Sequence, residues 1–162
     1  MQRTIRALIL LAVATWLWLP APPPAAGAAD GGYRLSSGQT VYVPVYSNVF
    51  SGPRARPFNL AAMLSIRNTD LQQGLQITAI DYYDSNGKLL RRHLAKPQFL
   101  APLASTYVYL EEKDTSGGFG ANFIVRWKAG KEINAPIIEC VMIGAESGQG
   151  ISFVSPGQVI RE

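Results

Sequence analysis

The sequence predicts an all-β fold, an immunoglobulin-like antiparallel β-sandwich of about 7–8 strands. From Gln39 onward, short runs rich in valine, isoleucine and tyrosine alternate with stretches of glycine, proline, asparagine and aspartate. No segment carries apolar residues at helical spacing over a length that would form a stable helix. Many short strands separated by turn residues are typical of a sandwich or a barrel.

Residues 1–28 have the order of a secretory signal peptide. Arg3 and Arg6 form a basic start, residues 7–19 form an apolar run, and residues 26–28 (AGA) offer a cleavage site. The apolar run is shorter than the roughly 20 residues that span a bilayer. We therefore expect cleavage, no stable membrane insertion afterwards, and a periplasmic or secreted protein.

The segment after the signal peptide has the size of one domain. Residues 29–38 are small and polar and are expected to form a flexible N-terminus. Residues 39–162 are expected to form a single β-sandwich domain. Two of the 15 basic residues leave with the signal peptide, so 13 basic residues face 11 acidic ones. This balance lacks the concentrated positive charge of nucleic-acid-binding proteins, and we expect no nucleic-acid partner.

Thr40–Tyr46 (TVYVPVY) is the first predicted strand, because valine alternates with threonine, tyrosine or proline along it. Pro44 has no amide hydrogen to donate to a neighbouring strand, so an edge position or a bulge is expected. Ser47–Pro57, which combines serine, glycine, proline and arginine, is predicted to be a loop.

Leu60–Asn68 is the second predicted strand. Leu64 and Ile66 fall on one face, and Ser65 and Arg67 fall on the other, as expected for a strand with one face in the core. The polar residues that follow are predicted to form a turn.

A hairpin is predicted after the third strand, Gln76–Tyr83. In Asp84–Gly87 (DSNG), aspartate suits the first position of a type I turn, and glycine suits the left-handed fourth position. A three-residue loop sets Asp81 opposite Arg91, and a two-residue loop sets it opposite Arg92. Either register gives Asp81 a cationic neighbour across the hairpin.

The rest of the chain continues the same pattern of strands and connections. In Asn122–Lys128, the side chains of Phe123, Val125 and Trp127 share one face. Connections are expected at 96–102, 111–120, 129–136 and 144–150. The further predicted strands are Thr106–Leu110, Asn122–Lys128, Ile137–Ile143, Ile151–Val154 and Val159–Ile160.

The sequence contains few residues that could carry a reaction. His93 is the only histidine, so histidines of one chain cannot form a metal cluster, and no G-x-S-x-G segment supplies a nucleophile. Cys140, the only cysteine, lies in an apolar run and is expected to be a buried structural thiol, with an intermolecular disulfide as the alternative. We therefore expect no catalytic residue, no metal and no cofactor.

Two further segments have simpler explanations than ligand binding. Asp81, Asp84 and Asn86 are spaced like part of a calcium loop, but the predicted turn accounts for the same residues. Gly117–Gly120 (GGFG) lacks the G-K-[ST] ending of a phosphate loop and is expected to be a mobile loop.

Several segments together resemble a known family. YVPVYSNVF, LSIRNTD, IDYYDSNGKLL, GGFGANFIVRW, NAPIIECVMIG and QGISF follow one another between Tyr42 and Ile160. Their order and their residues are similar to those of the bacterial family catalogued as domain of unknown function 3124. The resemblance implies an exported protein and supports the domain boundaries, but it implies no activity, substrate or cofactor. Some members are lipoproteins, and this sequence lacks the leader cysteine that would carry a lipid.

The family pattern also supplies the candidate binding residues: Tyr46, Arg67, Asn68, Asp70 and Tyr83. Asn68 and Asp70 have a structural explanation, because both side chains can bond their own backbone in a turn. Arg67 lies on the polar face of its strand and lacks such an explanation. We expect a recognition patch if Arg67, Asp70 and Tyr83 meet on one rim.

These observations favour a non-enzymatic protein-interaction module of the cell envelope. Thr40–Tyr46 is the edge at which a partner strand would add. The alternative is a small-ligand or glycan-binding domain that stacks sugars on tyrosines and Trp127. A hydrolytic enzyme built on His93 is the less favoured alternative. A flat apolar patch would favour a protein partner, whereas a concave aromatic groove would favour a glycan. The sequence leaves the oligomeric state open.

Overall fold

Strands and turns account for all of the chain that the computed structural model describes, which is residues 34–146 and 149–162. The predicted signal peptide and the first residues of the segment 29–38 lie outside these ranges. No helix that could span a membrane occurs within them. The strands are β1 (Leu35–Val45), β2 (Asn48–Ser51), β3 (Arg56–Asn59), β4 (Ala61–Arg67), β5 (Leu75–Tyr83), β6 (Leu89–Arg92), β7 (Gln98–Leu100), β8 (Ser105–Leu110), β9 (Ala121–Asn134), β10 (Ile137–Glu146), β11 (Gln149–Pro156) and β12 (Gln158–Arg161).

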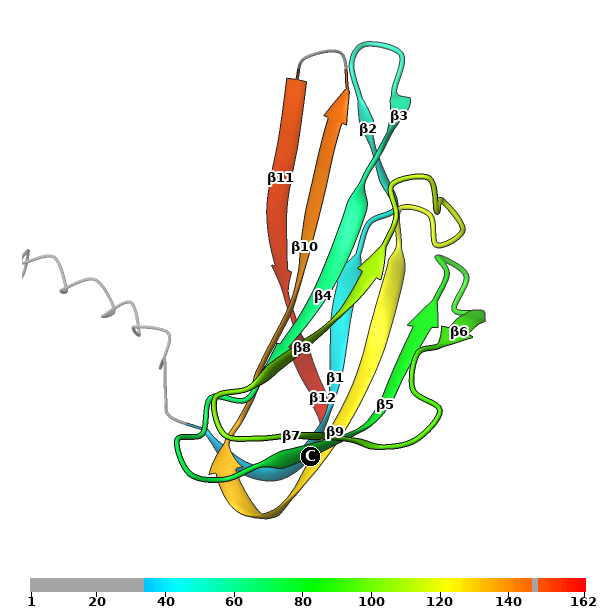
Figure 1. The fold of residues 1–162 in the computed structure, drawn as a ribbon. Coiled ribbons are helices and arrows are strands. Elements are labelled where there is room, and N and C mark those ends of the chain that lie inside the picture. Colours follow the sequence, from blue (N-terminus) through cyan, green and yellow to red (C-terminus); the bar gives the residue numbers. More distant parts are fainter. Residues whose placement is uncertain (1–33, 147–148) are drawn as a thin grey trace, which may run out of the picture. The chain divides into compact units, whose positions relative to one another are not determined.

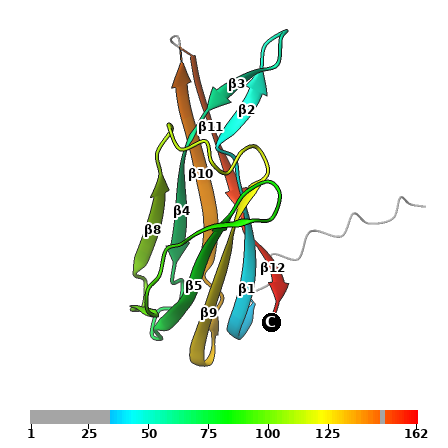
Figure 2. The same ribbon diagram turned by 90° about the vertical axis from the view of Figure 1, so that its right-hand side faces the viewer.

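The strands form two main sheets that pack against each other as a sandwich (Figure 1). One sheet has the order β12-β1-β9-β5-β6, and β7 also pairs with β5. The other has the order β11-β10-β4-β8, and β2 and β3 form a separate hairpin. Figure 2 shows β9 between β1 and β5 in the first sheet. All pairings between the described strands are antiparallel, which confirms the predicted all-β sandwich.

The core lies between the inner faces of the two sheets. Alternate residues of each strand point inward, as the period of two requires. The six-stranded sheet contributes its valines from β1 and its aromatic residues from β5 and β9, and the four-stranded sheet contributes aliphatic residues and sulfur-containing side chains. The largest fully buried side chains are Tyr82, Phe123, Leu60, Leu64, Ile66, Leu75, Ile77, Ile80, Ile133, Met142, Val43 and Val45.

A bulge in β5 changes which residues of that strand face the core. The register with β9 shifts between Ile77 and Ala79, so the buried positions change from odd to even numbers. Ile80 and Tyr82 therefore point inward and Asp81 points outward. A β-bulge has this effect because it inserts one unpaired residue into the strand.

Strand β1 does not lie at a sheet edge, but the alternative predicted for Thr40–Tyr46, a bulge, is present as a register shift between Thr40 and Val41. It pairs with β9 along most of its length and with β12 at Thr40–Tyr42. β12 pairs with β1 only as far as Tyr42. Pro44, which has no amide hydrogen, therefore lies where β12 no longer pairs with β1. Strand addition at Thr40–Tyr42 would therefore have to displace β12.

Three segments predicted as connections contain strands. Ser47–Pro57 holds β2 and the start of β3, 96–102 holds β7, and β9 continues to Asn134 instead of ending at Lys128. This continuation is stabilised by β1, because Leu35 and Ser36 pair with Asn134 and Ile133. The described part of the segment 29–38 is therefore strand from Leu35 on.

The predicted turn between β5 and β6 is confirmed. The amide of Gly87 donates to the carbonyl of Asp84 at 3.0 Å, and Gly87 has a φ of 76°. The Asp84 carboxylate accepts the amides of Asn86 and Lys88. A register shift between Tyr82 and Tyr83 then sets Asp81 opposite Arg92. The ion pair of Asp81, however, is made with Arg126 of β9, at 2.9 Å.

Candidate interaction surface

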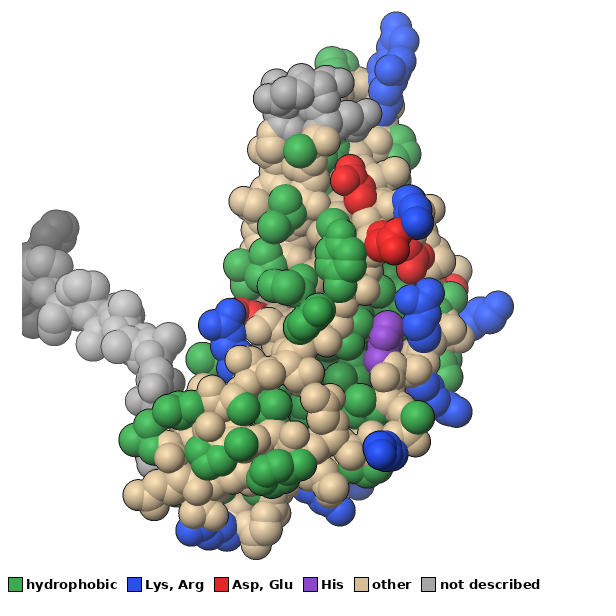
Figure 3. Space-filling view, in the orientation of Figure 1, with side chains coloured by type: hydrophobic (Ala, Val, Ile, Leu, Met, Phe, Trp, Pro, Cys, Tyr) green, Lys and Arg blue, Asp and Glu red, His purple; other side chains and the backbone are tan. Residues whose placement is uncertain are grey.

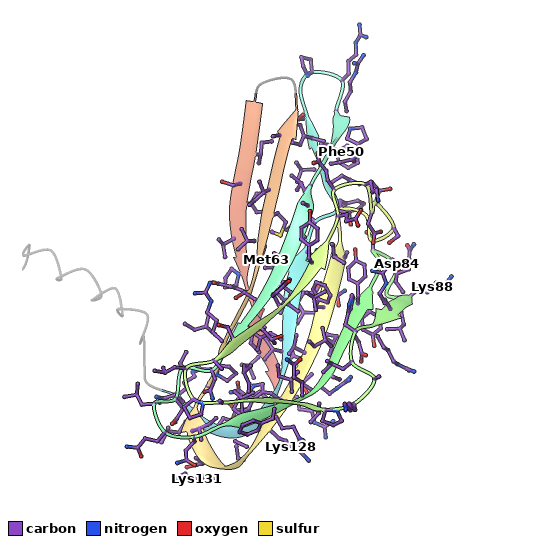
Figure 4. All side chains as sticks on the ribbon, viewed as in Figure 1. Phe50, Met63, Asp84, Lys88, Lys128 and Lys131 are labelled. Atoms are coloured by element: carbon purple, nitrogen blue, oxygen red, sulfur yellow. The ribbon has the colours of Figure 1, made fainter. Side chains whose placement is uncertain are left out.

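The outward side of the four-stranded sheet is an apolar surface. We call it the outer apolar face and define it by Met63 on β4, Tyr107 and Tyr109 on β8, Ile137, Val141 and Ile143 on β10, and Val154 on β11. The exposed fraction of these residues runs from 39% for Met63 to 68% for Tyr107, except for Val141, which is half-buried and less exposed than the others. Figure 3 shows hydrophobic side chains gathered on this side of the sheet, and Figure 4 marks Met63.

The strand register assembles these side chains into one surface. Tyr109 lies opposite Met63, Met63 lies opposite Val141, and Val141 lies opposite Val154. This row crosses all four strands. Directly opposed side chains on one face of a sheet are about 5 Å apart and contact one another. The outer apolar face is therefore continuous from one edge of the sheet to the other.

Two charged residues, Arg67 and Glu139, lie among the apolar residues and face each other. The Arg67 guanidinium lies 4.0 Å from the Glu139 carboxylate and also donates to the Ser65 hydroxyl at 3.0 Å. Arg67 therefore projects outward, as its place on the polar face of the strand predicts. The two charges cancel, and the surface has no net charge.

The outward side of the six-stranded sheet has a different character. Arg126 and Lys128 of β9 are exposed there, and Asp81 is paired with Arg126. Thr40 and Tyr42 of β1 flank them. The two outer faces of the sandwich thus differ in polarity, and the apolar one is the stronger candidate for an interaction.

The predicted patch of Arg67, Asp70 and Tyr83 is split by the fold. Arg67 ends β4 and Asp70 lies in the turn before β5, whereas Tyr83 ends β5. Nine residues of strand separate the two ends of β5, a distance of roughly 26 Å. These residues do not share a rim, and of the five candidates only Arg67 lies next to a residue of the outer apolar face, opposite Ile137.

Asn68 and Asp70 stabilise the turn between β4 and β5, as the sequence predicts. Asn68 is 2% exposed, and its amide group donates to the carbonyls of Gln73, Leu100 and Ala101 at 2.8, 3.3 and 3.0 Å. Its side-chain oxygen accepts the amide of Asp70. Asn68 thereby joins the turn to the connection between β7 and β8, and its role is architectural.

Asp70 anchors the same turn through its carboxylate. One oxygen accepts the amides of Gln72 and Gln73, and the other accepts the amide of Asn134 at the end of β9. These hydrogen bonds hold the pKa of Asp70 below its ordinary value of 3.8, and the one from the Gln72 amide has the largest effect.

We expect Asp70→Asn to reduce stability in a pH-dependent way. Because the pKa is lower in the folded state, the carboxylate stabilises the fold fully above the ordinary pKa, and this contribution is lost as pH falls through the folded value. The difference in unfolding free energy between the native protein and the variant should be largest near neutral pH and should shrink below about pH 4. Urea titrations at several pH values measure it. A difference that does not vary with pH would contradict this explanation.

Tyr46 and Tyr83 lie at the other end of the six-stranded sheet and are half-buried. The Tyr46 ring packs edge-on against Phe153, with centroids 5.6 Å apart. Tyr83 pairs with Asn122 of β9 and Leu89 of β6. The Tyr46 ring therefore contributes to packing, whereas the backbone of Tyr83 is held in the sheet by its pairing with both neighbours.

Arg67→Ala is expected to leave stability nearly unchanged. More than half of the Arg67 side chain is exposed, and an exposed ion pair contributes about 0–1 kcal/mol. The melting temperature should fall by no more than a few degrees in a thermal scan. A large fall would instead assign Arg67 to the architecture of the sheet.

His93 does not sit in a catalytic arrangement within the described residues. Its ring packs edge-on against Phe123 and Tyr82, with centroids 5.7 and 6.5 Å apart. The pKa of His93 is lowered mainly by burial and further by the positive charge of Arg91. No hydrogen bond joins its imidazole to an acid or a hydroxyl in this part of the chain, and its Nε2 atom is buried without a partner.

A cleft of about 640 Å³ lies beside the edge strand β8. Both signs of charge line it, and Tyr109 is the single aromatic residue in its wall. His93 is not part of this lining. The lining residues are Arg91, Tyr109, Leu110, Glu111, Lys113, Asp114 and Ser116.

Cys140 is fully buried on the inner face of β10, which confirms a free structural thiol in the described structure. Burial raises the pKa of this thiol to about 12. A buried protonated thiol is a poor nucleophile. An intermolecular disulfide through Cys140 is not compatible with this packing.

The glycine-rich segment Gly117–Gly120 is packed against its neighbours. The carbonyls of Gly117 and Gly118 accept the amides of Ser85 and Ser47, both at 3.0 Å. A Cβ atom on Gly117 would collide with the Tyr82 hydroxyl. These contacts show a packed segment where a mobile loop was expected. The amides of Gly118 and Gly120, the groups that would bind a phosphate, donate to the Thr115 carbonyl at 3.2 Å and to the Ser85 hydroxyl at 2.9 Å.

Among the described residues, no group of three or more histidine, cysteine, aspartate or glutamate side chains could hold a metal ion. Asp84 accepts backbone amides and Asp81 pairs with Arg126, so the residues of the calcium-like spacing have other partners.

The surface residues were missed by the sequence analysis, although a signal existed. Ala61–Leu64 and Ile137–Ile143 are apolar at both odd and even positions. A strand with one wet face normally alternates apolar and polar residues. Apolar residues at both odd and even positions therefore predict a strand whose outward face is apolar as well as its inward face.

Comparison with known proteins identifies a family and two distantly similar structures. The model of the family described as "Protein of unknown function (DUF3124)" matches residues 38–160. No curated protein matches the sequence. The crystal structure of Thermotoga maritima 1070 is 12% identical, with a TM-score of 0.46, and the match covers 74% of this chain and 92% of that one. The structure of FlgD from P. aeruginosa is 13% identical, with a TM-score of 0.24, and the match covers 76% and 74% of the two chains.

Proposed function

The chain belongs to the DUF3124 family, and from its surface we propose that it is an exported, non-enzymatic protein-interaction module of the cell envelope. A protein partner binds to the outer apolar face. Export is supported by the order of charged, apolar and small residues in positions 1–28. Binding is supported by the row that runs from Tyr109 to Val154 across four strands.

The composition of the outer apolar face suits a protein interface. Tyrosine and methionine are enriched in such interfaces, whereas lysine and glutamate are depleted. Tyr107, Tyr109 and Met63 supply exposed apolar area, and Glu139 is already paired with Arg67. Contiguous exposed apolar patches on a folded domain typically mark interaction sites.

Sugar stacking has less support. Trp127, which the sequence offered as a stacking platform, is 3% exposed and points into the core. Tyr107 and Tyr109 lie on the outward face of an edge strand, and the neighbouring cleft contains one aromatic residue. Stacking on several rings would require them to line a common groove.

The proposal is tested by capture from an envelope extract with matched surface variants. The native protein, Met63→Lys, Tyr109→Lys and Lys128→Glu serve as baits. Lys128→Glu is the control, because it changes the charge by two units on the outward side of the other sheet. We expect a defined protein to be recovered with the native bait and the control, and to be reduced at least about tenfold with the two lysine variants.

Two results would contradict the proposal. Equal recovery with all four baits would place binding elsewhere on the molecule. Recovery of polysaccharide alone, with no protein that depends on Met63 or Tyr109, would favour the glycan-binding alternative. Because both positions are exposed, each variant should remain folded, which circular dichroism checks.

A further inference from the structure

The edge strand β11 is long and carries no charge. It spans Gln149–Pro156 (QGISFVSP) and pairs with β10 on one side. No strand of the described chain pairs with its other side. An edge strand presents a row of backbone amides and carbonyls to which another strand can add. Proteins normally protect such edges with short length, charge, proline, or a covering segment. β11 has one proline, Pro156, which is its last residue.

The other sheet edges have that protection. In the six-stranded sheet, β6 and β12 have four residues each, and they carry Arg91, Arg92 and Arg161. The edge strand β8 also has no charged residue, but it is shorter, with six residues. β11 has eight residues and no charged residue.

We propose that β11 pairs antiparallel with β11 of a second copy of this chain, so that the two four-stranded sheets form one continuous sheet across a two-fold axis. This proposal goes beyond the proposed function and does not depend on it. Backbone amides and carbonyls of the two edges supply the hydrogen bonds. The outer apolar faces of the two copies then lie side by side.

The absence of charge is the reason that the partner is a second copy. Two identical antiparallel strands bring the residues near the two-fold axis close to their own equivalents, so a lysine or arginine near the axis would meet a like charge. Like charges directly opposed on a sheet are destabilising. β11 avoids this conflict, whereas β6, with Arg91 next to its middle, does not. The outward residue Val154 of β11 also continues the apolar row toward the second copy.

The dimer is expected to dissociate on dilution. One pair of eight-residue strands is a small contact compared with the roughly 800 Å² per partner that stable complexes bury. Sedimentation velocity over a wide concentration range, with protein produced from the full-length sequence, should therefore show a monomer that converts to a dimer. A monomer at every concentration would overturn the proposal.

Lysine variants locate the contact. Ser152→Lys and Val154→Lys place a charge on exposed positions of β11, and each should raise the dissociation constant at least about tenfold. Gln158→Lys is the control, because it adds the same charge at an exposed position of β12. If Gln158→Lys raised the dissociation constant as much as the β11 variants do, this result would contradict pairing through β11.

Cysteine variants supply a second, independent readout. Ser152→Cys and Val154→Cys place a thiol near the two-fold axis, and mild oxidation should produce a disulfide-linked dimer. Cys140 is fully buried and does not compete. Tyr107→Cys, at the opposite edge of the same sheet, should remain a monomer. Equal cross-linking of Tyr107→Cys and of the β11 variants would contradict the proposal.

Discussion

Replacing Asn68 by alanine is expected to lower the free energy of unfolding by about 3 kcal/mol. The change removes the side chain that donates to the carbonyls of Gln73, Leu100 and Ala101, and it leaves these acceptors without that donor in a closed site. An unsatisfied buried polar group costs about 1–3 kcal/mol, and several are affected together. Equilibrium unfolding in urea measures the loss.

Two further substitutions separate this cause from a general effect of mutation. Asn68→Asp keeps the size of the side chain but turns a donor into a carboxylate that faces carbonyl oxygens, so it should be at least as damaging as alanine. Gln72→Ala, at an exposed position of the same turn, should change stability by less than about 0.5 kcal/mol. A mild effect of Asn68→Asp would show that the hydrogen bonds do not hold this turn.

Gly157→Ala is expected to destabilise the fold by about 1–3 kcal/mol. Gly157 joins β11 to β12, where the chain crosses from one sheet to the other. Its amide donates to the carbonyl of Ile138 at 2.8 Å, and a Cβ atom would lie 2.7 Å from that oxygen and 2.7 Å from Cγ1 of Val41. The oxygen belongs to the backbone of β10, and Val41 is a core residue that is 4% exposed, so little space is left for the added methyl group.

Gly130→Ala is the matched control for Gly157→Ala. A Cβ atom at Gly130 would meet nothing within 4 Å, so the change should be neutral or slightly stabilising. Thermal unfolding of both variants measures the difference. Equal melting temperatures would contradict the steric account of the crossing between sheets.

The sequence predicted the elements that depend on local residues. The β5–β6 turn follows from Asp84 and Gly87, and the inward positions of β9 follow from the alternation of Phe123, Val125 and Trp127. The bulge in β5 was not predictable, because pairing with β9 selects the unpaired residue. The position of β1 inside its sheet depends on β12, the last strand of the chain.

The candidate surface was harder to predict than the fold. Asn68 and Asp70 drew attention as polar residues, but their polar atoms are used within the turn. Met63 and Val154 appeared to be ordinary strand residues, and only the register of β4, β10 and β11 places them in one row. A surface made by four strands requires knowledge of which strands are neighbours.

The most direct test of the central claim is photo-crosslinking in living cells. A photoreactive benzophenone amino acid replaces Tyr107 on the outer apolar face or, in a control strain, Lys128 on the outward side of the other sheet; both positions are exposed. If the outer apolar face binds a protein, irradiation should link position 107 to a discrete partner and leave position 128 unlinked. Discrete cross-links from position 128, with none from position 107, would contradict the account.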